Sequence, residues 1–367
     1  MKLLETILLT TDFGKGSAPA MDAAVALAQT FESKLVLLHV IAESLLPFLS
    51  DQGDIAEIEK RLHEVAKQIE AQGVGAPEIF LGKGVPAEVI CGEAARRDAN
   101  LIVIGCGARE RGGKCRPGVT ADRLLRRAIT PVWIARMGAA PTPRRILCPT
   151  DTSAASRRGL KNALALCRKF NAKLTVLNVQ EPMLPLHTPI VGLSQEKDQA
   201  RLNRQQRDFD ELLTAFDFHS VDWTKKVRYG TTHKEIVAEA AELKADLITM
   251  GTVGKTGVER ILLGSVTHKV LQELPCSVLT MKEEDVVRLR LESAISAIEE
   301  HFMRGQQLLE RGLLADAVRE FDQCLLSSPA YAAAWKGKAL AYERLGEKDQ
   351  AEAARAAAKR IRELRRP

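Results

Sequence analysis

The sequence predicts an α/β protein with two tandem doubly wound parallel-sheet domains, followed by an all-α helical-repeat tail. The first observation is an internal duplication, since the run ILLTTD at 7–12 returns as ILCPTD at 146–151. The second is that each copy alternates short runs rich in Val, Ile and Leu with helical patterns of 12 to 20 residues. Parallel strands need long crossovers and are buried on both faces, so this alternation indicates a parallel sheet with helices on each side.

The two copies also agree beyond their first strand. A valine follows the aspartate of that strand by 28 residues in each copy, at Val40 and Val179. We therefore expect a first domain over 1–138 and a second over 144–283. An open sheet of this Rossmann-like kind binds ligands beyond the carboxyl ends of its strands. In the second domain, five apolar runs predict strands at 144–149, 173–180, 222–229, 246–251 and 276–281.

Composition is that of a globular protein. Hydrophobic residues make up 46%, and the 53 basic and 47 acidic residues are interleaved, as on solvated helix faces. Aromatic residues are only 4%, which argues against nucleic acid as a partner because stacking platforms are scarce. The opening MKLLETILLTTD reaches Asp12 without a signal-peptide core, and no apolar run approaches the roughly 20 residues of a membrane span. We expect a cytoplasmic protein with no membrane partner.

The seven cysteines form no CxxC pair and match no histidine spacing, so we expect no metal site. Most of them fall in apolar segments and are interpreted as small buried thiols. Cys106 and Cys115 differ because they flank a loop rich in Gly and Arg. We expect this setting to be exposed and basic, where a thiol pKa can be lowered, so a redox role stays open.

A glycine-rich stretch carries the main functional signal. The tripeptide GKT that begins at Gly254 is like the end of a P-loop, but Thr249 stands where that motif requires its first glycine. Another spacing is present: Gly251, two residues, Gly254, nine residues, then Gly264 and Ser265. Gly264 precedes a predicted helix, whose first backbone amides favour an anion. We expect the glycines to let the backbone approach a phosphate and Ser265 to add a hydroxyl donor.

Together with the aspartate that ends the first strand, this spacing resembles the ATP-binding branch of the universal stress protein family. The family motif G-x2-G-x9-G-[ST] is met in full, and the resemblance covers most of the chain. It implies ATP as the ligand, with Mg²⁺ left open, and no catalysis. The family's dimers pair domains through an edge strand, which implies pairing of the two halves within this chain and leaves a homo-oligomer open. The implied binding residues are Pro149, Thr150, Asp151, Val179, Gly251, Gly254, Gly264, Ser265, Val266 and Thr267.

The first half departs from that motif. Gly105 and Gly118 keep the overall spacing, but Ala108 replaces the second glycine and Val119 replaces the hydroxyl residue. The aspartate and the valine persist, so an adenine pocket is compatible with the sequence while the phosphate cradle is damaged. We expect one nucleotide site per chain. The loop between the glycines is either a solvated loop or a contact for another anion, and its charges are Arg109, Arg111, Lys114 and Arg116.

The remaining segment, 294–367, is expected to form the helical tail. A period of 34 residues relates Gly312 to Gly346, and the segment resembles two tetratricopeptide repeats at about 298–331 and 332–365.

In the second repeat Arg355 stands where the first has Phe321, which is typical of a terminal repeat that faces solvent. Because two repeats are fewer than the three usually needed for an independent solenoid, we expect the tail to lean on the α/β body or on another chain. Assembly, docking and binding of a partner peptide are the open roles.

The leading functional hypothesis is a non-catalytic stress-response protein in which bound nucleotide sets a conformation or an assembly that the tail reports. No residue set in the crevice supplies a general base with an orienting partner, and His233 and His268 lie on predicted helices. The alternatives are a slow ATPase or nucleotidyl-transfer enzyme, and a scaffold with vestigial nucleotide sites.

Overall fold

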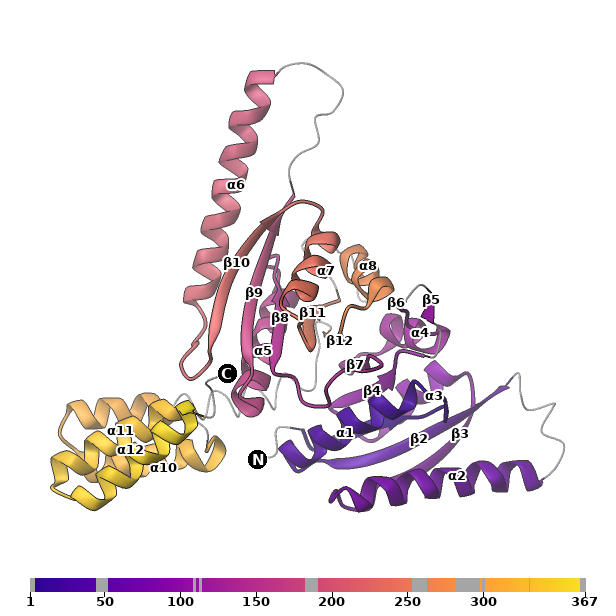
Figure 1. The fold of residues 1–367 in the computed structure, drawn as a ribbon, viewed down its shortest axis with the longest axis horizontal. Helices are drawn as coiled ribbons and strands as arrows, with labels where there is room; N and C mark the ends of the chain where they lie inside the picture. The colour runs from indigo at the N-terminus through magenta and orange to yellow at the C-terminus, as the bar shows by residue number, and fades with distance from the viewer. Residues whose placement is uncertain are drawn as a thin grey trace.

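The computed structural model describes residues 4–43, 52–107, 110–111, 114–181, 191–252, 263–281, 298, 301–329 and 331–363. Figure 1 shows two sheet-based units and a group of helices at the C-terminus.

The first unit is a parallel sheet with the strand order β3-β2-β1-β4-β7. A short antiparallel hairpin, β5 (Glu110–Arg111) and β6 (Lys114–Cys115), lies between β4 and the next helix. The other elements are β1 Thr6–Thr10, α1 Ser17–Phe31, β2 Lys34–Ala42, α2 Gln52–Ala71, β3 Glu78–Gly84, α3 Pro86–Arg96, β4 Leu101–Gly105, α4 Val119–Arg127 and β7 Val132–Ala135.

The second unit repeats this topology with the order β10-β9-β8-β11-β12. Each of its strands starts at or one residue after the predicted first residue and ends at the predicted last one. Local signals explain some helix ends: Ser153 caps α5 by accepting from the Ser156 amide at 3.2 Å, and Asn171 ends that helix in the left-handed conformation. The elements are β8 Arg145–Pro149, α5 Ala154–Phe170, β9 Lys173–Gln180, α6 Val191–Thr214, β10 Trp223–Tyr229, α7 Thr232–Glu242, β11 Leu247–Gly251, α8 Ser265–Glu273 and β12 Ser277–Met281.

The two units form one ten-stranded sheet, because β7 of the first pairs with β12 of the second. This central pair is antiparallel, whereas the other pairs of the ten-stranded sheet are parallel. Trp133 stands opposite Leu279 in the central register, and both side chains are buried. Pairing of the halves through an edge strand within the chain is thus confirmed.

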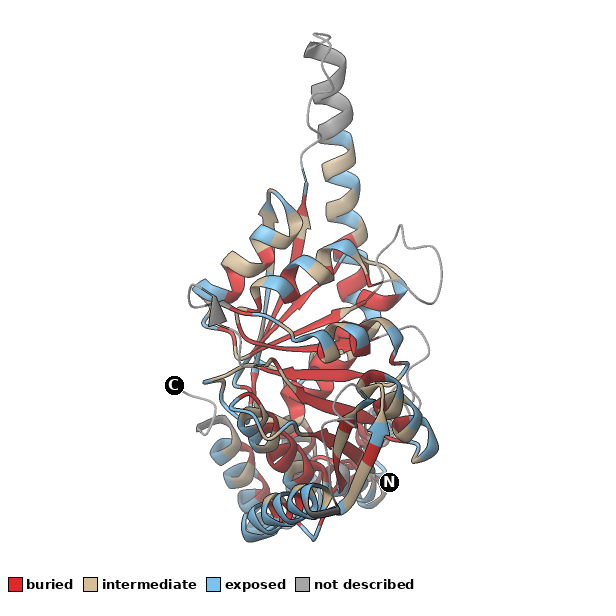
Figure 2. Cartoon of the chain, turned by 90° about the vertical axis from the view of Figure 1, so that its right-hand side faces the viewer, coloured by how far each residue is buried: buried red, intermediate tan, exposed pale blue. Residues whose placement is uncertain are grey.

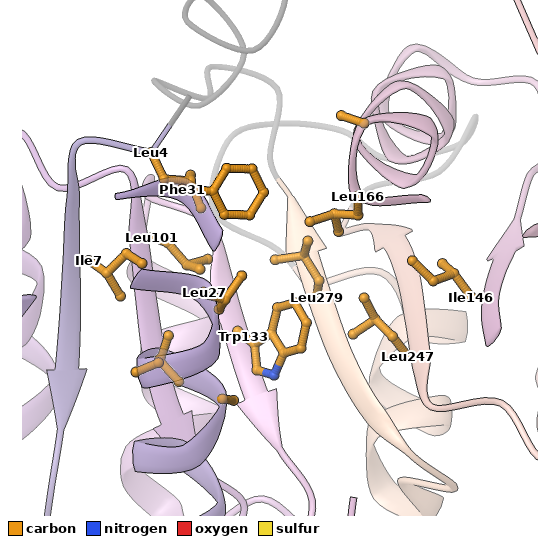
Figure 3. Close-up of a cluster of buried hydrophobic side chains, with 14 of the residues drawn as sticks. Leu4, Ile7, Leu27, Phe31, Leu101, Trp133, Ile146, Leu166, Leu247 and Leu279 are labelled. Atoms are coloured by element: carbon orange, nitrogen blue, oxygen red, sulfur yellow. The ribbon is translucent and has the colours of Figure 1, made fainter. Parts of the chain in front are cut away.

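Each face of the long sheet has its own apolar core. Residues of β1 alternate between the faces, with Ile7 and Leu9 on one side and Leu8 on the other. The first face is covered by α1, α2, α5 and α6, and its core runs across the junction of the units, where Trp133 lies beside Leu279 (Figure 3). The second face is covered by α3, α4, α7 and α8. Figure 2 shows the strands buried between helices whose outer faces are exposed.

The C-terminal tail consists of helical residues 301–310, then α10 (Leu314–Ser327), α11 (Ala332–Leu345) and α12 (Lys348–Glu363). Consecutive helices pack on one another around a separate core. The tail also touches the α/β body, since the Phe302 ring lies 6.3 Å from the His219 ring, centroid to centroid.

Phe321 is the centre of the tail core. Phe321 is fully buried, and its ring packs against Gly305 and Gly337. A side chain at either glycine would collide with the ring, since a Cβ atom there would lie 2.7 Å (Gly305) or 2.4 Å (Gly337) from it. Arg355, at the corresponding place in α12, instead reaches the carboxylate of Glu343 on the surface. This arrangement suits two stacked helix pairs with a solvent-facing end, and the tetratricopeptide interpretation stays a prediction.

None of the helices in the described part of the chain is both long enough and apolar enough to cross a membrane.

Candidate functional site

The carboxyl ends of β8, β9 and β11 meet at one edge of the second unit, and backbone bonds lock them together. The Thr150 amide donates to the Leu177 carbonyl at 2.8 Å, and the Asn178 side-chain amide donates to the Thr150 carbonyl at 2.8 Å. Pro149 and Thr150 are therefore buried, whereas Asp151 emerges exposed at the rim and Val179 is half-buried beside it.

Asp151 begins the loop from β8 to α5. One of its carboxylate oxygens accepts the Ser153 amide at 3.0 Å, and Thr152 between them takes a positive φ of 66°. The short turn leaves Asp151 exposed at the carboxyl end of β8, and a carboxylate is an acceptor for hydroxyl groups.

Gly251 ends β11 with a half-exposed backbone, but its lack of a side chain has a packing reason. A Cβ atom there would lie 2.6 Å from the Ala155 methyl group and 2.9 Å from its carbonyl carbon, because the first turn of α5 crosses the strand end. The expectation that Gly251 mainly lets the backbone approach a phosphate is therefore incomplete, since glycine at this place lets helix and strand touch. Gly254 lies outside the described residues.

Helix α8 starts at the same edge. Gly264 precedes it, and the Gly264 amide donates to the Thr252 carbonyl at 2.6 Å, which ties the helix start to the end of β11. The first amides of an α-helix have no acceptor inside the helix. At α8 no side chain caps them, and its first turn carries no acidic residue. Ser265 is exposed at this end.

The next two predicted residues contribute differently. Val266 is half-buried and packs on the second-face core. Thr267 is buried, and its hydroxyl donates to the Gly251 carbonyl at 2.9 Å. In this structure the hydroxyl fastens α8 to the strand end, and contact of Thr267 with a ligand stays a prediction.

The first unit has an equivalent crevice, with a cavity of about 280 Å³. Asp12 at its rim accepts the Ser17 hydroxyl at 2.7 Å and the Gly14 amide at 2.8 Å. His39 lines the cavity and its Nδ1 lies 2.7 Å from the Thr11 carbonyl oxygen, as Asn178 bonds Thr150 in the second unit. Burial lowers the pKa of His39, so the neutral ring with Nδ1–H as donor fits this contact.

The two crevices differ in charge at the start of their helices. Asp122 lies in the first turn of α4, where an acid opposes a bound anion, and His268 occupies the same place in α8. Because α4 and α8 flank the central strand pair, these two side chains face one another, with His268 Nε2 lying 3.8 Å from Asp122 Oδ1. Val119, which follows Gly118 at the start of α4, is 68% exposed and offers no hydrogen bond.

Comparison with known proteins decides the family. The model of the universal stress protein family matches twice, over residues 4–136 and 142–282. The chain belongs to the universal stress protein family.

Relatives of this family share the fold and part of the sequence. A universal stress protein of Methanocaldococcus jannaschii is 34% identical over 145 residues, which are 38% of this chain and 82% of that protein. A putative universal stress protein of Staphylococcus aureus is 28% identical over 152 residues, 40% of this chain and 87% of that one. The crystal structure of an Archaeoglobus fulgidus universal stress protein matches with a TM-score of 0.59 and 24% identity, covering 76% of this chain and 98% of that chain.

Within this universal stress protein, the structure gathers nine of the ten predicted residues at one strand edge, with Gly254 outside the described part. Sequence reasoning missed His39, Asn178 and the Asp122–His268 contact. The first two could have been found because each stands 27 residues after the aspartate of its unit.

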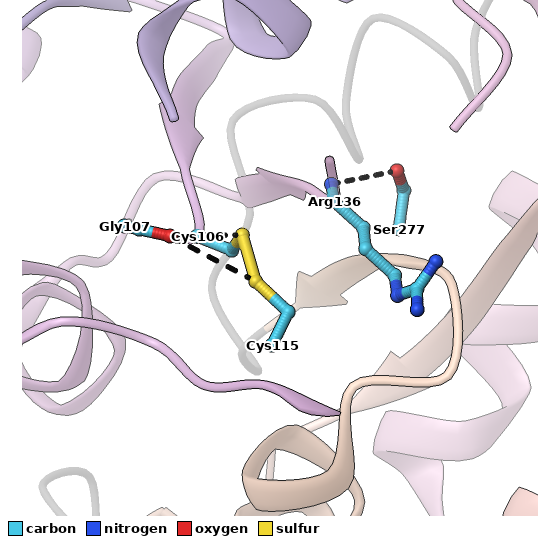
Figure 4. The surroundings of a disulfide bond; sticks show 5 residues. All are labelled: Cys106, Gly107, Cys115, Arg136 and Ser277. Carbon is cyan, nitrogen blue, oxygen red and sulfur yellow. Dashed lines mark hydrogen bonds between the residues drawn. A yellow bond between two sulfur atoms is a disulfide. The ribbon is translucent and has the colours of Figure 1, made fainter. Parts of the chain in front are cut away.

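The cysteines of the first unit correct another expectation. Cys106 and Cys115 are not exposed; both are buried, and a disulfide joins them (Figure 4). Both cysteines belong to the apolar core of the second face.

Proposed function

We propose that this universal stress protein binds ATP, with or without Mg²⁺, in the crevice of its second unit and acts as a non-catalytic stress-response protein. The observation that carries the proposal is the start of α8, a helix end with neither a side-chain cap nor an acid in its first turn. Such an end attracts phosphate through its amides and its dipole.

The neighbouring groups suit the remaining parts of the nucleotide. Asp151 is an exposed acceptor at the end of β8 and can accept ribose hydroxyl groups. Val179, half-buried at the end of β9, offers an apolar contact to a base. Ser265 adds a hydroxyl at the phosphate end.

The first unit is proposed not to hold a triphosphate. Asp122 lies in the first turn of α4, and Val119 replaces the serine hydroxyl, so the helix start favours an anion less than that of α8 does. The cavity of the first unit leaves room for an uncharged group of moderate size.

The helical tail is proposed to mediate protein interaction or assembly. Large apolar side chains are exposed along it, and exposed apolar surface is a feature of protein interaction sites. They are Met303, Leu313, Leu326, Leu340 and Leu345.

Calorimetric titration of the full chain with ATP tests the site. We expect a stoichiometry near one per chain. Gly254→Val should weaken binding at least tenfold, roughly 1.4 kcal/mol, because a side chain at the loop obstructs approach to the phosphate. Ala108→Val is the matched control at the equivalent position of the first unit and should leave binding unchanged. Two equivalent sites, or full affinity in Gly254→Val, would contradict the proposal.

A further inference from the structure

Cys106 and Cys115 form a bonded pair that the nucleotide site does not use. Their Cα atoms are 6.6 Å apart, and the side chains are 0% and 2% exposed. Cys106 follows β4 directly, and Cys115 ends β6 (Figure 4). The bond thus fastens β6, the second strand of the hairpin, to the carboxyl end of β4 in the large sheet.

This fastening lies where the two units meet. The Cys106 amide donates to the carbonyl of Ala135 at 3.0 Å, and Ala135 ends β7, the strand that pairs with the second unit. On its other side, β6 lies beside α8, the helix whose start forms the proposed phosphate site (Figure 1). The disulfide therefore joins the end of β4 to β6, a strand that lies against α8.

The buried pair lies close in sequence to the lining of the first unit's cavity. Gly107, the residue after Cys106, lines the open cavity of the first unit, as does Gly118, three residues after Cys115. A molecule of the size of a peroxide in this cavity would meet Gly107, and because both sulfur atoms are buried, the backbone there has to open for the reaction.

Four cysteines outside the pair carry buried free thiols. Burial raises the pKa of Cys148, Cys276 and Cys324 to about 12, so few of these thiols are ionised near neutral pH. Because the thiolate is the nucleophile, they are poor reactants toward an oxidant.

We propose that Cys106 and Cys115 are a reversible thiol–disulfide site that reacts with peroxides and raises the nucleotide affinity of the second unit when oxidised. The effect on affinity rests on the proposed function; the redox site itself does not.

The chemistry balances with a hydroperoxide as the oxidant. One cysteine thiolate attacks the terminal peroxide oxygen, so that an S–O bond forms and the O–O bond breaks; the leaving oxygen departs after protonation as an alcohol, or as water when the oxidant is hydrogen peroxide. The second thiolate then attacks the sulfenic sulfur, which forms the S–S bond and releases the sulfenic oxygen as water after protonation. Two electrons pass from the two thiols to the peroxide. A dithiol reverses the step by exchange and is itself oxidised to a disulfide.

Conformational entropy is the physical link between the disulfide and the nucleotide affinity. The bond closes a segment whose ends are nine positions apart, and such a closure removes states that the open chain can occupy. In the oxidised form β6 is therefore held beside α8, so this segment loses less conformational entropy when the nucleotide binds. In the reduced form part of the ordering of this segment has to accompany binding, which lowers affinity.

The experiment compares the full chain treated with hydrogen peroxide and the full chain treated with dithiothreitol, each freed of reagent. Thiol titration after denaturation should count five thiols in the oxidised form and seven in the reduced form. ATP should bind the oxidised form roughly fivefold more tightly by calorimetry, within the usual range of coupling between sites.

Two variants act as controls. Cys106→Ala/Cys115→Ala should bind ATP like the reduced chain and should not respond to peroxide. Cys91→Ser, which alters a half-buried cysteine of α3, should lose one thiol in each state and keep the whole affinity shift. The wild-type comparison needs no substitution, so a double variant that fails to fold leaves the test intact.

Hydrogen exchange of the α8 amides without nucleotide separates this proposal from the proposed function. We expect slower exchange in the oxidised form. A thiol count that neither reagent changes overturns the redox site, and equal exchange of α8 in both states overturns its coupling to α8. Equal ATP affinities overturn the link to the nucleotide site. If ATP binds neither form, the proposed function and that link fail together, while the thiol count still decides the redox site and α8 exchange still decides its coupling to α8.

Discussion

Ser265 is the residue at which hydrogen bonding to the proposed phosphate can be removed with little change in folding. It is the first residue of α8 and its side chain is exposed. We expect Ser265→Ala to weaken ATP binding by about tenfold, because a hydrogen bond to a charged group contributes on the order of 1.5 kcal/mol. Calorimetry measures the change, and Val119→Ala at the same place in α4 is the control. Identical affinities of Ser265→Ala and the wild type would remove Ser265 from the site.

His39 gives the first unit a dependence on pH. Burial lowers its pKa below the ordinary value of 6.5, so the unfolded chain binds a proton more readily than the folded chain. The resulting stability is present above pH 6.5 and is lost as the pH falls toward the lowered pKa.

We therefore expect the Tm from calorimetry to fall between about pH 7 and pH 5, and His39→Asn to reduce that fall. The replacement copies Asn178, whose side-chain amide makes the same bond to the strand before it. His63→Gln, on the exposed face of α2, is the matched control and should leave the pH dependence unchanged. A variant with an unaltered pH profile would show that His39 is not the responsible group.

At the scale of elements, the tail helices depend on one side chain between two glycines. Phe321 of α10 fills the space that Gly305 and Gly337 leave open. Phe321→Ala should destabilise the tail by about 3–5 kcal/mol through loss of buried area and the cavity left behind. Leu326→Ala on the same helix is the control, since Leu326 is 75% exposed. Proteolysis of the tail, followed by mass spectrometry, should be faster in the first variant only; equal rates in both would contradict this packing.

At the scale of the whole molecule, the starts of α4 and α8 lie on either side of the central strand pair and differ in charge. His268 and Asp122 face one another there, but their Nε2 and Oδ1 atoms are 3.8 Å apart, which is longer than a hydrogen bond. We expect ATP turnover by the full chain to stay far below about 1 per second, the lower end of the usual range for enzymes. Phosphate release measures the rate. A rate near that value, abolished by Ser265→Ala and retained in Val119→Ala, would identify an ATPase.

The duplication and the short apolar runs by themselves determined the α/β class and the five strands of the second unit, because a parallel strand buried on both faces is a continuous apolar run. The spacing from Gly251 to Ser265 likewise placed the start of α8, since glycine before a helix is a local signal. Only the tertiary structure decided the contact of Gly251 with Ala155, the burial and bonding of Cys106 with Cys115, and the meeting of Asp122 with His268. The physical reason is that periodicity records which face of an element is buried and not which distant segment covers it. Those contacts depend on how helices cross strand ends and on how two units join at β7 and β12.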